Sequence, residues 1–177
     1  QELCYVDSDT DGVGGTSEGT SSTIDCSESG FSLVNTDCVD SDSNTFPGAA
    51  PNDSSTECMT DADGDDYGDT SAPTGGSAGT DCDDSDNSIN TDVTYFADTD
   101  SDGFGDSSST NDVCSNTPPS GFVTDNTDCL DSDGNTFPGA APNDSSTECM
   151  TDADGDDYGD TSAPSGGFQQ TETLNYV

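Results

Sequence analysis

The most informative stretch of the sequence is 98–106, which reads DTDSDGFGD. Its carboxylates stand at alternate positions, Asp98, Asp100 and Asp102, and a glycine follows directly. In a loop that wraps around a cation, alternate side chains point inward, so the carboxylates at positions 1, 3 and 5 converge on one ion. Glycine at position 6 permits the positive φ that turns the carbonyl of position 7, here Phe104, toward the same ion. The spacing therefore indicates an oxygen cage for a hard cation such as Ca²⁺.

Three further acidic loops share this pattern and begin at Asp7, Asp61 and Asp152. Glu18 stands at position 12 of the first loop and completes the spacing of a calcium-binding loop there. We expect the following carboxylates and position-7 carbonyls to bind Ca²⁺: Asp7, Asp9, Asp11 and Val13; Asp61, Asp63, Asp65 and Tyr67; Asp98, Asp100, Asp102 and Phe104; Asp152, Asp154, Asp156 and Tyr158. Position 9 adds Asp69, Asp106 and Asp160 as candidate ligands.

Two of the loops differ in the place of their glycine. In the loops that begin at Asp61 and Asp152, position 6 is aspartate and position 4 is glycine. The turn is therefore expected to differ there, which leaves the carbonyl ligand from Tyr67 or Tyr158 open. An EF-hand is not expected, because no loop has a flank with the pattern of a helix.

Three segments that we call Asp-Cys knots offer additional carboxylates. Each contains Asp-Cys followed by aspartates three and five residues after the first one. Three of the acidic loops have no carboxylate at position 12, so we expect the knots to supply a distal ligand. The residues are Asp37, Asp40 and Asp42; Asp81, Asp84 and Asp86; and Asp128, Asp131 and Asp133.

Self-comparison divides the chain into two copies of one unit. Residues 35–73 recur as 126–164 with differences at only two positions, an offset of 91 residues that also maps the first acidic loop onto the third. We predict two domains, 1–91 and 92–177, of which the second is a shortened copy without a counterpart to the knot at Asp81. Such near-identity indicates a recent duplication within a longer tandem array.

The charge of the chain demands external cations or disorder. Asp and Glu number 39 and Lys, Arg and His are absent, so the formal charge is −39 and no side-chain salt bridge can form. A hydrophobic content of 26 % favours disorder when taken alone. The regular spacing of the acids favours bound cations instead. Nucleic acid and anionic membranes are excluded as electrostatic partners, and no apolar run reaches the roughly 20 residues of a membrane span.

The predicted fold is irregular and small all-β, built from calcium- and disulfide-stapled repeats that are extended and lack a large core. Gly, Pro, Ser, Thr and Asp dominate and apolar stripes are absent, so no helix beyond a turn is expected. Short strands are expected at Leu3–Val6, Val93–Ala97 and Thr171–Val177. The aromatic residues beside the loops are expected to form small local cores.

Eight cysteines without histidine indicate disulfides in an oxidising compartment rather than zinc sites. We therefore expect a secreted protein of the cell surface, and the start at Gln1 indicates a removed signal segment or a fragment. Proximity in sequence favours the pairs Cys26–Cys38, Cys114–Cys129 and Cys58–Cys82. Cys4 and Cys149 then remain, and they could pair within the chain, between subunits or, for Cys149, with a cysteine beyond this fragment.

The combination YFADTDSDGFGD, a cysteine, GFV, NTDCLDSD, FPGAAP and EC resembles the MopE-type metal-binding repeats of secreted microbial proteins. The acidic loops also resemble thrombospondin type 3 calcium repeats. The resemblance covers nearly the whole chain twice, and it implies that the aspartates of loops and knots are calcium ligands and that cysteines pair locally. One MopE-type protein is associated with copper. Copper is not expected in this chain, because hard carboxylate oxygens select calcium. The pattern departs from the family after Asp86.

Two identical turns carry candidate glycosylation sequons. Asn52 and Asn143 each begin an Asn-Asp-Ser triplet within a Pro-bounded segment that is expected to lie at the surface. Covalently attached glycans would keep a chain with so little core soluble.

These features favour a structural function: a calcium-binding subunit or stalk segment of an extracellular filament that associates with itself. The alternative is a calcium-dependent adhesin or carbohydrate-binding module, which would need exposed aromatics beside an open calcium site. Calcium buffering or mineral nucleation by a polyacidic surface is a further reading. An enzyme is not expected, because the chain lacks the His, Lys and free Cys that carry most acid–base and nucleophilic chemistry.

Overall fold

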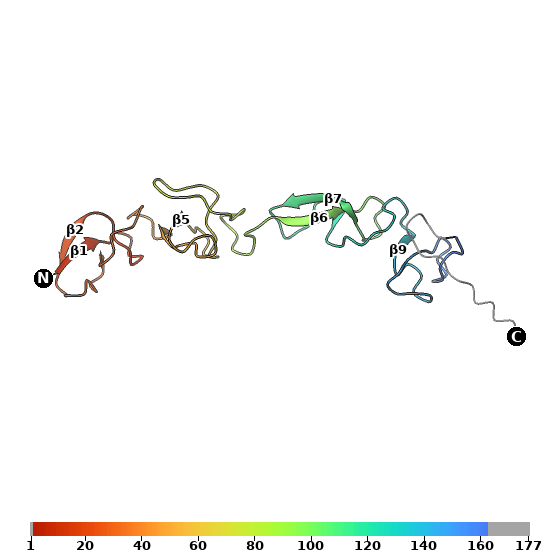
Figure 1. Ribbon diagram of the computed structural model, residues 1–177, viewed down its shortest axis with the longest axis horizontal. Coiled ribbons are helices and arrows are strands. Elements are labelled where there is room, and N and C mark those ends of the chain that lie inside the picture. The colour runs from red at the N-terminus through yellow and green to blue at the C-terminus, as the bar shows by residue number, and fades with distance from the viewer. Residues whose placement is uncertain (1, 163–177) are drawn as a thin grey trace. The chain divides into compact units, whose positions relative to one another are not determined.

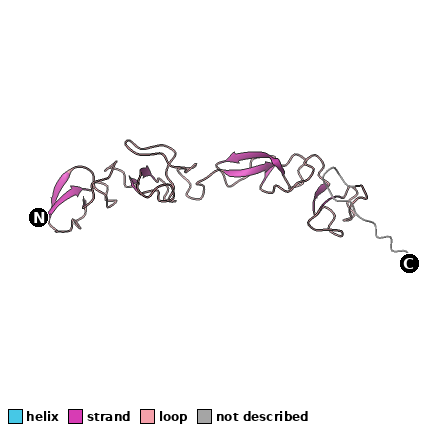
Figure 2. Ribbon diagram, in the orientation of Figure 1, coloured by secondary structure: helices cyan, strands magenta, loops and turns pink. Residues whose placement is uncertain are grey.

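The computed structural model describes residues 2–162 and shows an irregular, small all-β fold. The described residues form ten short strands in four separate sheets. Figure 2 shows strands and loops among them and no helix. Within them there is accordingly no helix long and apolar enough to cross a membrane. The expected strand at Thr171–Val177 lies outside the described residues. The chain divides into two units, Gln1–Asp92 and Val93–Val177, which we describe separately.

The first unit begins with a three-stranded antiparallel sheet in the order β2-β1-β3. Strand β1 (Glu2–Val6) pairs with β2 (Glu18–Ser21) across the first acidic loop (Figure 1). On its other edge β1 pairs with β3 (Phe31–Ser32). Further along this unit, β4 (Thr45–Pro47) and β5 (Cys58–Thr60) form a two-stranded antiparallel sheet that ends at the second acidic loop.

The second unit repeats this arrangement. Its three-stranded sheet has the order β7-β6-β8, and its two-stranded sheet pairs β9 with β10. The bounds are Val93–Ala97 for β6, Asp106–Val113 for β7, Phe122–Val123 for β8, Thr136–Pro138 for β9 and Cys149–Thr151 for β10. Strand β6 confirms the prediction for 93–97, and β1 confirms the prediction for 3–6 with one additional residue. The two-residue and three-residue strands are too short to leave a pattern of alternation in the sequence.

All eight cysteines are disulfide-bonded, but the pairing predicted from proximity is wrong. The bonds are Cys4–Cys26, Cys38–Cys58 and Cys129–Cys149, with Cα atoms 5.9, 6.5 and 6.4 Å apart, and Cys82 and Cys114 are also in disulfides. Cys26–Cys38, Cys114–Cys129 and Cys58–Cys82 are therefore excluded. The reason lies in strand pairing: the β4–β5 and β9–β10 sheets bring the end of each Pro-rich turn back to the knot that precedes it.

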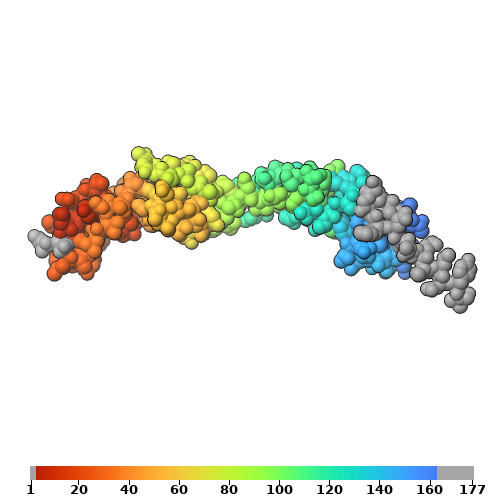
Figure 3. Space-filling view, in the orientation of Figure 1, coloured from red at the N-terminus to blue at the C-terminus, as the bar shows by residue number. Residues whose placement is uncertain are grey.

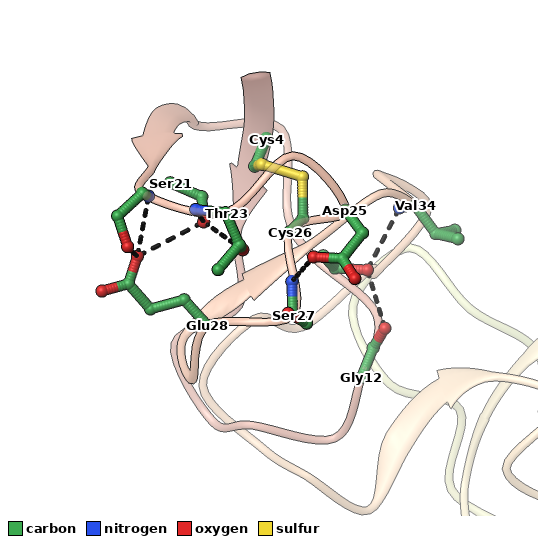
Figure 4. The surroundings of a disulfide bond; sticks show 11 residues. Cys4, Gly12, Ser21, Thr23, Asp25, Cys26, Ser27, Glu28 and Val34 are labelled. Carbon is green, nitrogen blue, oxygen red and sulfur yellow. Dashed lines mark hydrogen bonds between the residues drawn. A yellow bond between two sulfur atoms is a disulfide. The ribbon is translucent and has the colours of Figure 1, made fainter. Parts of the chain in front are cut away.

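The Cys4–Cys26 bond takes the place of a hydrophobic core in the first sheet. Both cysteines are buried, and Figure 4 shows the polar network around them. The Glu28 carboxylate accepts hydrogen bonds from the backbone and hydroxyl of Ser22, at 2.9 and 3.0 Å, and from the hydroxyl of buried Ser21 at 3.3 Å. The segment after β2 is thus held by a disulfide and one carboxylate rather than by apolar packing.

The buried apolar residues form small local clusters, as expected for repeats with little hydrophobic content. Ala50 and Met59 are buried in the first unit, and their repeats Ala141 and Met150 are buried in the second. Phe104 stacks on Phe137 with ring centroids 5.1 Å apart. Because burial of apolar surface is the main favourable term in folding, such small clusters leave a large share of the stabilisation to disulfides and to other cross-links.

Peptide mapping without reduction tests this connectivity. Trypsin cannot cut this chain, because Lys and Arg are absent. Cleavage before aspartate places each cysteine in a separate peptide. We expect peptide 1–6 linked to 25–36, and 37–39 linked to the peptide DSSTECMT, which occurs identically as 53–60 and 144–151, and each pair should separate into two single peptides after reduction. A link between 25–36 and 37–39 would contradict the structure.

Candidate metal centre

The first carboxylate of each acidic loop fixes the fold of that loop. Asp7 accepts the N–H of Thr10 on Oδ1 at 2.7 Å and the N–H of Gly12 on Oδ2 at 3.1 Å. Asp98 makes the same two bonds in the repeated loop, at 2.8 and 3.3 Å. Positions 4 and 6 both have positive φ, which is 68° at Thr10 and 98° at Gly12. The loop backbone therefore wraps around its own first side chain.

In the other two loops glycine stands at position 4 instead of position 6, but the turn is the same, contrary to expectation. Asp61 accepts N–H groups from Gly64 at 2.7 Å and from Asp66 at 3.1 Å, again positions 4 and 6. Gly64 has a φ of 81° and Asp66 a φ of 73°. Aspartate tolerates the left-handed region better than most residues, so glycine is needed at only one of the two positions. Asp152 repeats these contacts.

The fifth position of each loop keeps one carboxylate oxygen for other ligands. In all four loops its Oδ1 accepts the N–H of position 7, at distances of 2.7 to 3.0 Å. The position-7 residues Val13, Tyr67, Phe104 and Tyr158 are thereby held beside the carboxylates, as a carbonyl ligand would require. In the first loop, carboxylate oxygens of Asp7, Asp9 and Asp11 lie within 4.8 Å of one another, and those of Asp61, Asp63 and Asp65 do the same.

Each knot delivers its first aspartate to a loop by the same backbone contact. The N–H of Asp37 donates to the carbonyl of Gly14 at 3.1 Å, and that of Asp81 to the carbonyl of Gly68 at 2.9 Å. Asp128 donates to its equivalent glycine at 3.2 Å. The accepting residue is position 8 of the loop in every case. Asp37 is only 7 % exposed and Asp81 only 1 %, so both carboxylates lie inside the protein.

Ten buried carboxylate oxygens at these sites have no hydrogen-bond partner. They are Oδ2 of Asp9, Asp11, Asp37, Asp65, Asp102 and Asp128, and both oxygens of Asp63 and of Asp100. All of them belong to the first three loops or to the knots that face those loops. A buried charge without a partner is costly, so these oxygens are candidates for coordination to a cation.

Mutual repulsion and burial shift the proton affinity of these groups. Burial raises the pKa of Asp11 to about 6, and the charges of Asp9 and Asp37 add to the rise. Burial likewise raises the pKa of Asp102 to about 6, with Asp100 contributing. The pKa values of Asp37, Asp63, Asp81 and Asp128 are also raised, first by burial and then by adjacent carboxylates. Without a cation, these carboxyl groups therefore bind protons at a higher pH than ordinary aspartates do.

The donor set fits a hard divalent cation. Carboxylate oxygens converge in the loops that the structure describes, histidine is absent from the sequence, and every cysteine sulfur is in a disulfide. Oxygen ligands of this kind suit Ca²⁺, Mg²⁺ or Mn²⁺ rather than zinc or copper. The irregular loop geometry with many available oxygens favours Ca²⁺, which takes six to eight ligands, over Mg²⁺ with its strict octahedron.

The fourth loop is less complete than the others. Asp152 is buried and fixes the same turn, but Asp154 and Asp156 are exposed. None of the ten unpartnered buried oxygens belongs to this loop. Within the described residues, no knot follows it. Asp160, at its position 9, is half-buried and its N–H donates to the carbonyl of Thr151 at 2.8 Å.

Several predicted ligands also hold the loops and knots in place through hydrogen bonds. Asp40 accepts the N–H and hydroxyl of Ser8 at 2.9 and 2.8 Å, and Asp131 accepts the same groups of Thr99 at 2.7 and 2.6 Å. Oxygens of Asp131 also lie within 4.8 Å of those of Asp98 and Asp100. Asp69 accepts the N–H of position 2 in its own loop at 3.1 Å.

The remaining predicted ligands bond to nearby residues. Asp42 and Asp133 accept the hydroxyls of buried threonines at 2.8 and 2.9 Å. Asp84 accepts a backbone N–H at 3.2 Å, and Asp86 and Asp106 accept serine hydroxyls two residues away at 2.7 Å. Glu18 lies exposed in β2 opposite Tyr5, so Asp37 rather than Glu18 is the buried carboxylate added to the first loop.

A scan of protein-family models and searches of curated proteins and solved structures found no match to this chain. The function of the chain therefore has to be inferred from the geometry of its loops and knots.

The raised pKa values predict how pH acts on the metal-free protein. Asp11 and Asp102 titrate near 6 in the folded chain, above the ordinary value of 3.8, so the folded state binds more protons than the unfolded state between these values. The free energy of unfolding should therefore fall as pH rises from about 4 to 6. Thermal denaturation in metal-free buffer across this range measures the slope.

A charge-matched pair of variants isolates these groups from the repulsion of the whole chain. Asp11→Ala with Asp102→Ala should flatten the slope, whereas Glu57→Ala with Glu148→Ala removes the same charge from exposed positions and should preserve it. Saturating Ca²⁺ should reverse the sign, because calcium binds the deprotonated form. A melting temperature that rises with pH without metal would contradict the assignment.

Proposed function

We propose that this chain is a calcium-binding structural repeat protein of the extracellular space. The observation that carries the proposal is the set of ten buried carboxylate oxygens without partners, all located where loops and knots meet. A Ca²⁺ ion at each of the three complete sites supplies positive charge that no side chain of this sequence can supply. Each ion joins a loop to a knot that begins 20 or more residues after the start of that loop, as a cross-link does.

Calcium and disulfides together replace the hydrophobic core of each unit. The disulfides tie knots to the ends of the Pro-rich turns, and the ions tie the same knots to the acidic loops. Ligand binding to the folded state adds to stability by mass action, by about 2.7 kcal/mol per site when calcium is a hundredfold above its dissociation constant. Millimolar calcium outside cells would keep even weak sites filled.

The near-identical tandem units support a role as the repeating element of a filament or stalk. Repeats that are stabilised from within by short-range cross-links can be added in series without a shared core. The absence of basic residues means that contacts between copies cannot rely on side-chain salt bridges. Calcium is the available bridge between such acidic surfaces.

The oxidising environment that the disulfides require is consistent with secretion and with glycosylation. Asn52 and Asn143 are both exposed, and each lies in a turn fixed by its own backbone N–H, which donates to Asp66 or Asp157 at 3.0 Å. N-linked glycans at these positions would project from the turns without disturbing the metal sites.

Calcium titration by calorimetry tests the proposed function. We expect saturable binding at three or more sites, with dissociation constants on the order of 10⁻⁴ to 10⁻³ M as in extracellular modules. Asp37→Asn should remove or weaken by about tenfold the binding at the first site, because it replaces a buried charged ligand. Glu148→Gln removes one charge at an exposed position and should leave binding unchanged. Loss of binding in both variants, or no loss in either, would refute the site.

Mass spectrometry of the protein from its natural source tests glycosylation. We expect a glycan mass on the peptides that contain Asn52 and Asn143, removable by an enzyme that cleaves N-linked sugars. The variants Asn52→Gln and Asn143→Gln should each lose one such mass while calcium binding is retained. Unmodified peptides at both positions would refute this part of the proposal.

A further inference from the structure

We propose that Asp53 is a positioning residue that holds the Asp81 knot against the loop that begins at Asp61. This inference rests on the proposed calcium-binding function and assigns a role to a carboxylate that the acidic pattern does not single out. Asp53 lies in the Pro-rich turn between β4 and β5, outside both the loops and the knots.

The Asp53 carboxylate joins two separate segments of the first unit. Its Oδ2 accepts the N–H of Gly68 and the N–H of Thr80, both at 2.9 Å. Its Oδ1 accepts the hydroxyl of Thr80 at 2.6 Å. In Figure 3 the yellow surface of the segment after the second acidic loop lies on the orange surface of this turn. Three hydrogen bonds occupy this carboxylate, so it acts as a clamp rather than as a ligand.

The two clamped residues are the ones that deliver the fourth carboxylate of the site. Gly68 is position 8 of the loop, and its carbonyl accepts the N–H of Asp81 at 2.9 Å. Thr80 is the residue directly before Asp81. Asp53 therefore holds both partners of the contact that buries Asp81 next to Asp65, whose charge contributes to its raised pKa.

The turn presents Asp53 in a fixed position. The N–H of Asp53 donates to the carbonyl of Ala50 at 3.1 Å, and the neighbouring N–H of Asn52 donates to Asp66 of the loop at 3.0 Å. Burial opposes ionisation of Asp53, but the hydrogen bonds from Thr80 and Gly68 outweigh it and hold the pKa below its ordinary value. The clamp thus stays charged wherever the metal ligands are ionised.

The second unit provides a natural comparison within the same chain. Asp144 occupies the same place in an identical turn and accepts the N–H of Gly159 at 2.7 Å. Among the described residues this is half of the clamp, and the loop beside it has exposed Asp154 and Asp156. In the first unit, where both halves are present, Asp63 and Asp65 are half-buried and carry unpartnered oxygens. Of the two loops that follow this turn, the one with both halves of the clamp is therefore also the one with the more buried carboxylates.

The test uses Tb³⁺ as a luminescent substitute for Ca²⁺ on the full chain. Tyr67 stands at position 7 of this loop, so the tyrosine-excited Tb³⁺ emission that is lost in Tyr67→Phe defines the Asp61 site. We expect Asp53→Ala to weaken Tb³⁺ and competing Ca²⁺ at this site by about 10- to 100-fold, the usual effect of removing an outer-shell partner. Thr80→Val leaves the turn intact and should weaken the same site by a smaller factor.

The matched control is Asp144→Ala, which alters the identical turn in the second unit and should leave the Asp61 site unchanged. Calorimetry should show the Asp37-containing site unchanged in Asp53→Ala, which separates a local effect from unfolding. Unaltered affinity of the Asp61 site in both Asp53→Ala and Thr80→Val, or equal losses at every site, would overturn the inference while leaving calcium binding standing. A wild-type chain without the Tyr67-dependent signal would overturn the assignment of the site itself.

Discussion

The structure depends on one electrostatic constraint: carboxylates are buried together in a chain that has no cationic side chain. Four such groups meet around each of the first three loops, and backbone N–H donors satisfy only part of their oxygens. Burial raises the pKa of Asp11 and of Asp102, and repulsion between the neighbouring carboxylates adds to the rise. A divalent cation among these carboxylates, as we propose, would relieve this repulsion.

The backbone divides the work of each carboxylate between structure and binding. At position 1 both oxygens accept N–H groups and shape the turn. At position 5 of the first three loops, one oxygen shapes the turn and the other has no hydrogen-bond partner. The knots show the same division among residues: their first aspartate faces the loop, and Asp40 or Asp131 ties the knot to the second residue of that loop. Disulfides connect knots to the ends of the Pro-rich turns, so a loop, a knot and a turn form one cross-linked module.

Local sequence patterns predicted what depends on local spacing. The positions of the four loops, the strands β1 and β6, and the absence of helix from the described residues all follow from alternation and composition. The disulfide pairs could not be predicted, because Cys38 meets Cys58 through the pairing of strands only three residues long. Asp53 was missed for a similar reason, since its partners Gly68 and Thr80 are distant in sequence. The sequence did not predict that all four loops share one turn, because Asp66 adopts a positive φ that was expected only of glycine.

The most direct test of calcium as the missing partner of these carboxylates is to locate the ions by anomalous diffraction from crystals grown with calcium. We predict an anomalous peak at each of three places: beside Asp9, Asp11 and Asp37, beside Asp63, Asp65 and Asp81, and beside Asp100, Asp102 and Asp128. Oxygen distances of about 2.3 to 2.6 Å would identify the ion as Ca²⁺. A folded chain at millimolar calcium and neutral pH with no peak at these carboxylates would contradict the central claim.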